Sequence, residues 1–145
     1  EGHTPLRFTA SIGSRLPAAP TAIGNALLTT LSDEEIAARF SRPQHFPRMT
    51  ENSVQSLPSL LVKVRAARER GYAVDDNEVH AGIYGVAMPI PPWSSGEPAM
   101  AIGTSLVSAS VSPELITQIV SDLDEAVRRL TNPLFHPALP VGEAS

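Results

Sequence analysis

The sequence predicts an α/β (α+β) domain in which an antiparallel sheet is flanked by helices. Residues 6–12 alternate strictly between apolar and polar side chains, and two later strand-like runs, 81–90 and 99–108, are joined by a proline-rich loop. Elsewhere, apolar residues recur at helical spacing. The 145 residues, of which 42% are hydrophobic and 18% charged, suffice for one globular domain with its own core.

Composition excludes several classes of protein. The chain has no cysteine, which excludes disulfides and thiolate metal sites and favours a reducing compartment, so we expect a cytoplasmic protein. It has no apolar run of about 18 residues and no signal peptide, so we expect no membrane partner. The net charge is −4 and the arginines are spread along the chain, so these residues predict no DNA-binding surface of their own.

The first fifty residues predict one strand, two short helices and a loop. Leu6–Ile12 places its apolar side chains on one side, as a half-buried strand does. Helical spacing over Thr21–Leu31 predicts a helix, and Ser32-Asp-Glu-Glu35 has the capping-box order that begins a second helix ending near Phe40. The prolines and polar residues of Ser41–Thr50 have no period and predict a loop.

A long helix and a hairpin follow in the middle of the chain. The helix begins near Ser56, and arginines in its last turn followed by Gly71 are a favourable helix stop. An acidic loop, Asp75–Glu78, then leads to the two strands of an antiparallel hairpin, Ala81–Ile90 and Ala99–Ser108.

The last predicted element is a helix with a well-marked start. Ser112 is its N-cap, Pro113 takes the first helical position, and an apolar stripe runs to Leu130 before Asn132 and Pro133. We therefore expect one folded domain over residues 1–133 and a loose tail over residues 134–145.

The two faces of the predicted hairpin differ in side-chain size, because side chains alternate between the faces of a strand. Even-numbered positions carry bulky residues suited to packing against helices, whereas the odd-numbered face carries mainly small ones: Ile83, Gly85, Ala87, Ala101, Gly103 and Ser105. Such a face favours a ligand cavity or, alternatively, the close approach of a helix to the sheet. The pattern leaves both interpretations open.

Three motifs occur in the order typical of one family. Gly13-Ser-Arg-Leu-Pro17, Thr21-Ala-Ile-Gly-Asn-Ala-Leu-Leu28 and the stretch from Gly71 to Ile90 resemble the effector-binding domain of IclR-type bacterial transcription regulators. The resemblance extends from about Leu6 to Leu130. It implies a GAF-like fold, a ligand sensor rather than an enzyme, and a homodimer or homotetramer. It also implies that the family's winged-helix DNA-binding domain and opening strands are missing from this chain, so that DNA is bound only through a domain absent here.

The resemblance further implies a set of ligand-binding residues. Carried onto this sequence, they are Arg15, Leu16, Asp75, Ile83, Gly85, Gly103 and Ser105. A small-molecule carboxylate could accept hydrogen bonds from the backbone of the Arg15–Leu16 loop and from Ser105. Asp75 would accept from a ligand hydroxyl or brace the loop. The two glycines suggest a roomy site for an aromatic or longer-chain carboxylate, with Trp93 as a wall of the site or, alternatively, an exposed loop tip or subunit contact.

Two other classes of function stay open at this stage. A small cofactor-free enzyme acting on a carboxylate substrate has candidate groups in Arg15, Asp75, Asp76, Glu78, His80 and Ser105. No spacing among them resembles a nucleophile elbow, a metal triad or a phosphate loop. A pure dimerisation module could use the outer face of the last helix or an exposed sheet edge. We predict no catalytic residue, no cofactor and no metal site, since Asp75–Glu78 lacks the ligand order of a calcium loop and the histidines lack zinc spacing.

Overall fold

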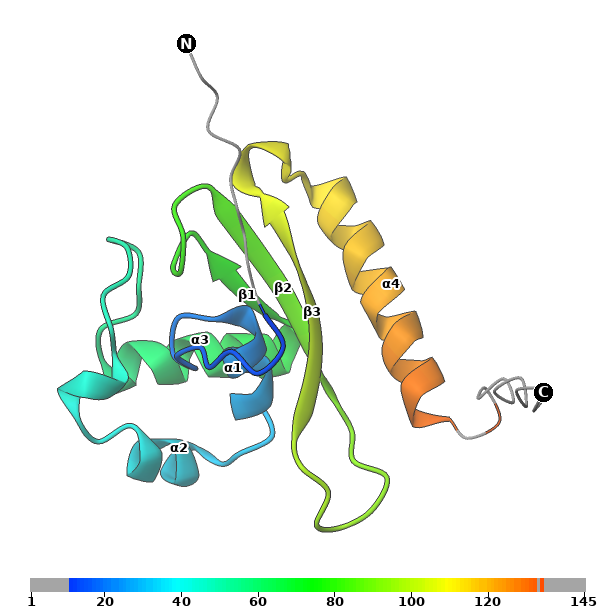
Figure 1. Ribbon diagram of the computed structural model, residues 1–145, viewed down its shortest axis with the longest axis horizontal. Coiled ribbons are helices and arrows are strands. Elements are labelled where there is room, and N and C mark those ends of the chain that lie inside the picture. The colour runs from blue at the N-terminus through cyan, green and yellow to red at the C-terminus, as the bar shows by residue number, and fades with distance from the viewer. Residues whose placement is uncertain (1–10, 133, 135–145) are drawn as a thin grey trace, which may run out of the picture.

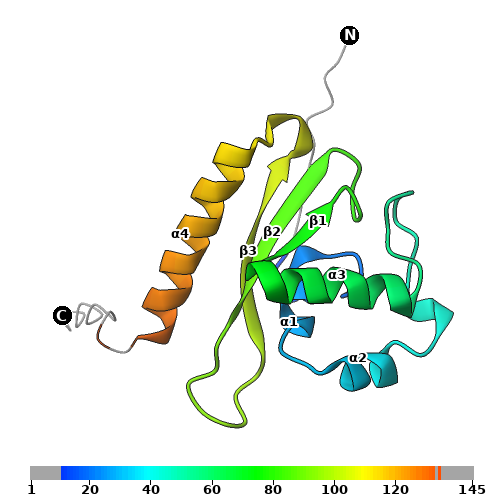
Figure 2. The same ribbon diagram turned by 180° about the vertical axis from the view of Figure 1, so that it is seen from behind.

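The computed structural model describes residues 11–132 and 134. Its centre is an antiparallel sheet of order β1-β2-β3, formed by Ala73–Asp76, Ile83–Ile90 and Met100–Val107. One face is covered by α4 (Pro113–Thr131), and the other by α1 (Ala22–Leu28) and α3 (Leu57–Arg70), as Figures 1 and 2 show from opposite sides. The remaining elements are α2 (Asp33–Arg39) and the single turns η1 (Pro43–His45) and η2 (Ser108–Ser110). The predicted antiparallel sheet flanked by helices is confirmed.

The sheet contains one strand more than the hairpin that we predicted from this region. The acidic segment predicted as a loop is in part strand β1, and Asp75 lies in that strand, where it pairs with Gly85. The four residues of β1 are too few to show an alternation, and their strand conformation depends on pairing with β2. The hairpin itself is confirmed, and β2 begins two residues later than the predicted Ala81.

The helix boundaries follow their capping residues. Thr21 accepts from the N–H of Gly24, Ser32 forms the predicted capping box, and Gly71 ends α3 in the left-handed conformation with φ 88°. The predicted Thr21–Leu31 helix ends at Leu28 instead. The Thr29 and Thr30 hydroxyls bond back to backbone carbonyls there, which competes with continued helix.

The core divides into three apolar groups that set the position of the sheet. Leu28, Ile36, Leu60 and Val64 belong to a cluster between α1, α2 and α3. Only alanines form the buried cluster where α1 and α3 meet the sheet: Ala22, Ala26, Ala67, Ala73 and Ala87. On the opposite face, β2 packs against α4 through Val86, Met88 and Leu123. The alanine cluster brings α1 close to the strands that carry the predicted site.

The predicted first strand, the predicted tail and Trp93 do not belong to the helices and strands described above. Most of the predicted strand Leu6–Ile12 lies outside the described residues, and its last two residues, which are described, are not in a strand. The predicted loose tail also lies outside them, apart from Leu134. Trp93 is half exposed in the β2–β3 loop, where its indole N–H donates to the carbonyl of Leu130 at 3.1 Å.

In the described part of the chain, no helix has the length and hydropathy needed to span a membrane.

Candidate functional site

The hairpin pairs in regular register, so the side-chain parity inferred from sequence holds. Gly85 pairs with Ser105, Val86 with Thr104 and Ala87 with Gly103, with no bulge between them. Even-numbered residues face α4, and odd-numbered residues face α1. The small-residue face therefore lies under α1.

Two neighbouring rows of this face, read across the three strands, differ in what covers them. Ala73, Ala87 and Gly103 form one row, and α1 packs its alanines against it. Asp75, Gly85 and Ser105 form the next row, with a carboxylate at one end, a glycine in the middle and a hydroxyl at the other end. Since neighbouring strands lie about 4.8 Å apart, the two ends of this row are roughly 10 Å apart. Both interpretations left open by the sequence therefore have to be considered for this face, since α1 packs on it.

A cavity of about 440 Å³, here called the sheet cavity, opens above the second row. It contains five of the seven predicted ligand-binding residues, Leu16, Asp75, Gly85, Gly103 and Ser105. The other two do not line it: Arg15 is exposed in the preceding loop, and Ile83 is buried at the start of β2. Trp93 does not line it either, so it is not the predicted wall of this cavity.

Sequence reasoning missed several residues that line the sheet cavity. They are Thr21, Ala22, Ile23, Val79, Val86 and Thr104. The first three come from the start of α1 and complete the family motif that begins at Thr21, so the motif itself was a signal. Thr104 belongs to the even-numbered face, which was predicted to pack against helices, and it is exposed on the edge strand β3.

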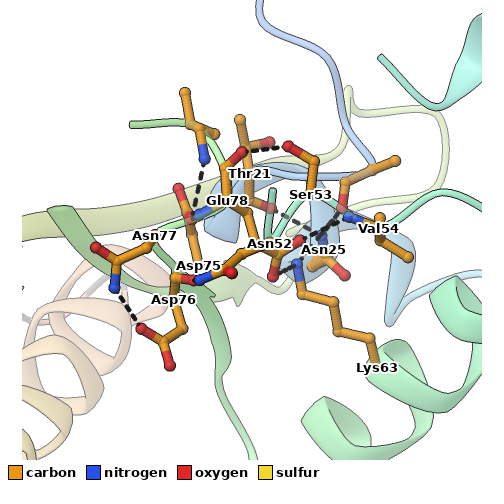
Figure 3. Close-up of polar contacts among 12 residues, drawn as sticks. Thr21, Asn25, Asn52, Ser53, Val54, Lys63, Asp75, Asp76, Asn77 and Glu78 are labelled. Carbon is orange, nitrogen blue, oxygen red and sulfur yellow. Dashed lines mark hydrogen bonds and ion pairs between the residues drawn. The ribbon is translucent and has the colours of Figure 1, made fainter. Parts of the chain in front are cut away.

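Asp75 is the charged residue of the sheet cavity lining, and it is 6% exposed. Its Oδ1 accepts from the backbone N–H of Glu78 at 2.7 Å and of Val79 at 3.4 Å (Figure 3). Burial raises the pKa of the Asp75 carboxyl, and these two hydrogen bonds and the nearby Lys63 ammonium lower that pKa in part. No side-chain hydrogen bond of the described residues occupies the Ser105 hydroxyl, so it is available to a ligand. The cavity therefore offers an acceptor at one end and a donor at the other.

A second, larger hollow of about 570 Å³ lies on the other side of α1. Its walls are mainly apolar, from Leu27, Leu31 and Phe40, and it contains none of the predicted site residues. The sheet cavity is the better candidate despite its smaller volume, because ligand sites combine apolar walls with a few convergent polar groups. Here those groups include the buried Asp75 carboxylate and the Ser105 hydroxyl.

Comparison with known proteins decides the class to which this site belongs. The family model described as the C-terminal domain of the bacterial transcriptional regulator IclR matches residues 1–132. The chain belongs to the IclR family. This IclR domain is the effector-binding part of a transcription regulator, and its relatives are regulators rather than enzymes.

Relatives and solved structures agree with this assignment. The IclR domain is 30% identical to the HTH-type transcriptional regulator XynR of Escherichia coli over 139 residues, which cover 95% of the chain and 54% of XynR. It thus spans about half the length of that curated relative. The crystal structure of the Agrobacterium tumefaciens repressor BlcR matches with TM-score 0.78 and 32% identity, over 89% of this chain and 52% of BlcR.

A third match is a ligand complex. The inducer-binding domain of a PobR double mutant from Acinetobacter, in complex with 3-hydroxybenzoic acid, matches with TM-score 0.72 and 25% identity. The match covers 84% of this chain and 69% of the PobR domain.

Proposed function

We propose that the IclR domain senses a small organic carboxylate, with an aromatic hydroxy acid as the favoured class, in the sheet cavity. The observation that carries the proposal is the row Asp75, Gly85 and Ser105, in which glycine leaves space between an acceptor and a donor. A volume of about 440 Å³ falls in the range of roughly 300–1,000 Å³ that is usual for small-molecule sites.

Charge placement orients the ligand in this proposal. A ligand carboxylate beside Asp75 would be repelled, so it binds at the far end of the row, where Ser105 can donate to it. The backbone of Leu16, which also lines the cavity, is a second source of donors. A hydroxyl on the other side of an aromatic ring then donates to Asp75. The 3-hydroxybenzoic acid bound by the PobR domain has this pair of groups, which supports the choice of class.

Sensing requires that the ligand prefer one conformation of the domain over another. The cavity lies between the start of α1 and the hairpin, so a ligand that binds more tightly when α1 is closer to β3 shifts the population toward that state. We propose that a winged-helix domain in the full regulator responds to this shift with altered DNA binding, and that the regulator assembles as a homodimer or homotetramer.

Ligand-observed NMR on the purified 145-residue chain tests this function. The panel holds aliphatic acids, benzoate, 3-hydroxybenzoate and 4-hydroxybenzoate, each followed for several hours so that turnover would be seen. We expect saturable binding of hydroxybenzoates, weaker binding of benzoate and unchanged ligand spectra. Product signals would favour the enzyme alternative, and an absence of binding by every acid would refute the carboxylate class.

A further inference from the structure

A buried ion pair lies beside the sheet cavity without lining it. The Lys63 ammonium from α3 lies 2.5 Å from Oε1 of Glu78, in the turn between β1 and β2, and the two side chains are 15% and 10% exposed (Figure 3). Neither residue lines the cavity. Removing two charges from water costs several kcal/mol per ion, so a buried pair is weak support for stability alone. Its position suggests another role.

The ion pair fixes the β1–β2 turn, residues 77–82, together with several hydrogen bonds. Oε2 of Glu78 accepts from the backbone N–H of Val54, and the Ser53 hydroxyl donates to the Glu78 carbonyl at 2.6 Å. The Thr50 hydroxyl donates to the carbonyl of Asn77 at 2.7 Å. Both the side chain and the backbone of Glu78 are therefore held by groups outside the turn.

The 77–82 turn also holds the Asp75 carboxylate. Backbone N–H groups of Glu78 and Val79 both donate to Oδ1 of Asp75, and neither of these bonds uses Oδ2. Val79 also lines the sheet cavity. A shift of Glu78 would thus move a wall of the cavity and release the fixed oxygen of its acceptor.

We propose that Lys63 is a positioning residue of the effector site: its ion pair with Glu78 holds the 77–82 turn so that Oδ1 of Asp75 is occupied and Oδ2 is presented to the ligand. This inference rests on the proposed function, because it assigns a role in recognising a ligand hydroxyl. Sites built to bind a hydroxyl discriminate strongly against analogues that lack it, provided that the buried acceptor is rigid.

The charges around Asp75 determine the direction in which its pKa changes when the Lys63 cation is lost. Lys63 and His80 both lower the pKa of the Asp75 carboxyl, and burial raises it. Burial lowers the pKa of the Lys63 ammonium, the Glu78 carboxylate raises it and Arg70 lowers it. Loss of the Lys63 cation therefore raises the pKa of Asp75, and its protonated fraction at a given pH increases.

The test compares Lys63→Met with two other variants of the 145-residue chain. Arg65→Met is the matched control, because Arg65 lies on the same helix and its ion pair with Asp33 is at the surface. Lys63→Arg keeps the cation. Each variant is titrated with 3-hydroxybenzoate and benzoate, and the Asp75 carboxyl carbon and the Glu78 and Val79 amides are followed by NMR without ligand.

For Lys63→Met we expect 3-hydroxybenzoate to bind about tenfold more weakly while benzoate binding changes less than about threefold, so that selectivity for the hydroxyl is lost. The Asp75 titration should move to higher pH, and the Glu78 and Val79 amide shifts should change. Lys63→Arg should recover most of the selectivity, and Arg65→Met should match the wild type in every measurement.

A purely structural role predicts a different result. Equal weakening of both ligands, or an unchanged Asp75 titration with unchanged amide shifts, would overturn the proposal. If Lys63→Met does not fold, Lys63→Gln, which can still donate to Glu78, provides the same comparison. If the wild-type protein binds neither 3-hydroxybenzoate nor benzoate, the proposed effector class fails. The NMR measurements without ligand still decide whether Lys63 positions Asp75.

Discussion

Replacing Gly103 by alanine tests how closely this position of β3 is packed against β2 and α1. A Cβ at this position would lie 2.8 Å from the carbonyl oxygen of Val86, 2.9 Å from Cβ of Ala87 and 2.9 Å from Cδ1 of Ile23. The Ile23 methyl can rotate away, but the other two atoms belong to the paired strand and cannot. Overpacking of this kind costs about 1–3 kcal/mol, and with two rigid contacts we expect the free energy of unfolding to fall by about 2 kcal/mol.

The direction of the change in stability distinguishes close packing at Gly103 from open space. In an open strand position, replacing glycine by alanine raises stability by about 0.4–1 kcal/mol, because the unfolded chain loses freedom. For a chain of this size, a loss of 2 kcal/mol lowers Tm by roughly 4–8 °C. Gly85→Ala is the control, since its Cβ would meet Ala22 and Asp75 at the milder distances of 3.2 and 3.3 Å.

Calorimetry and urea unfolding at fixed pH measure both variants. Gly103→Ala should melt several degrees below the wild type, and Gly85→Ala should stay within about 1 kcal/mol of the wild type. A Tm for Gly103→Ala equal to or above that of the wild type would refute the close packing of Gly103 against Val86 and Ala87.

Three further perturbations test the site and its support. Ser105→Leu should fill the sheet cavity and abolish hydroxybenzoate binding with an unchanged circular dichroism spectrum, whereas Ser121→Leu, on the exposed face of α4, should bind normally. Burial raises the pKa of Asp75, so this residue contributes a loss of stability as pH rises through that pKa; Asp75→Asn removes this loss, and the urea midpoint of the variant relative to the wild type should increase as pH is raised above about 4. Asn25→Ala removes a buried donor to three carbonyls and should lower the unfolding free energy by roughly 2–4 kcal/mol, against a small change for the exposed Asn52→Ala; equal urea midpoints for the two would contradict this.

Much of the fold could be predicted because its signals are local. Ser32 and Ser112 predicted the starts of α2 and α4, and Gly71 predicted the end of α3, since caps depend on only a few neighbouring residues. Strand β1 could not be predicted in this way. Its four residues include two acids, and Asp75 is tolerated in a buried strand because the following turn donates two backbone hydrogen bonds to it.

The Lys63–Glu78 ion pair could not be predicted from the sequence either. The lysine appeared as one of several cations on the polar side of a helix, and the glutamate as one of several acids in a solvated turn. Fifteen residues separate them, and no periodicity links a position in α3 to one in the β1–β2 turn. Only the packing of α3 along β1 brings them together. Charge patterns in sequence therefore identify the turn but not its partner.

Small residues on the hairpin illustrate why sequence alone left two interpretations open. A ligand cavity and a closely packed helix both require missing side chains, so the same glycines and alanines are compatible with either. The structure shows both uses on the same face of the sheet. Gly103 shares a row with Ala73 and Ala87, and Gly85 shares a row with Asp75 and Ser105. Both glycines line the sheet cavity, and a Cβ at either would meet a side chain of α1. Close packing in the first row also places the start of α1 over the second, so the packed row provides one wall of the cavity beside it.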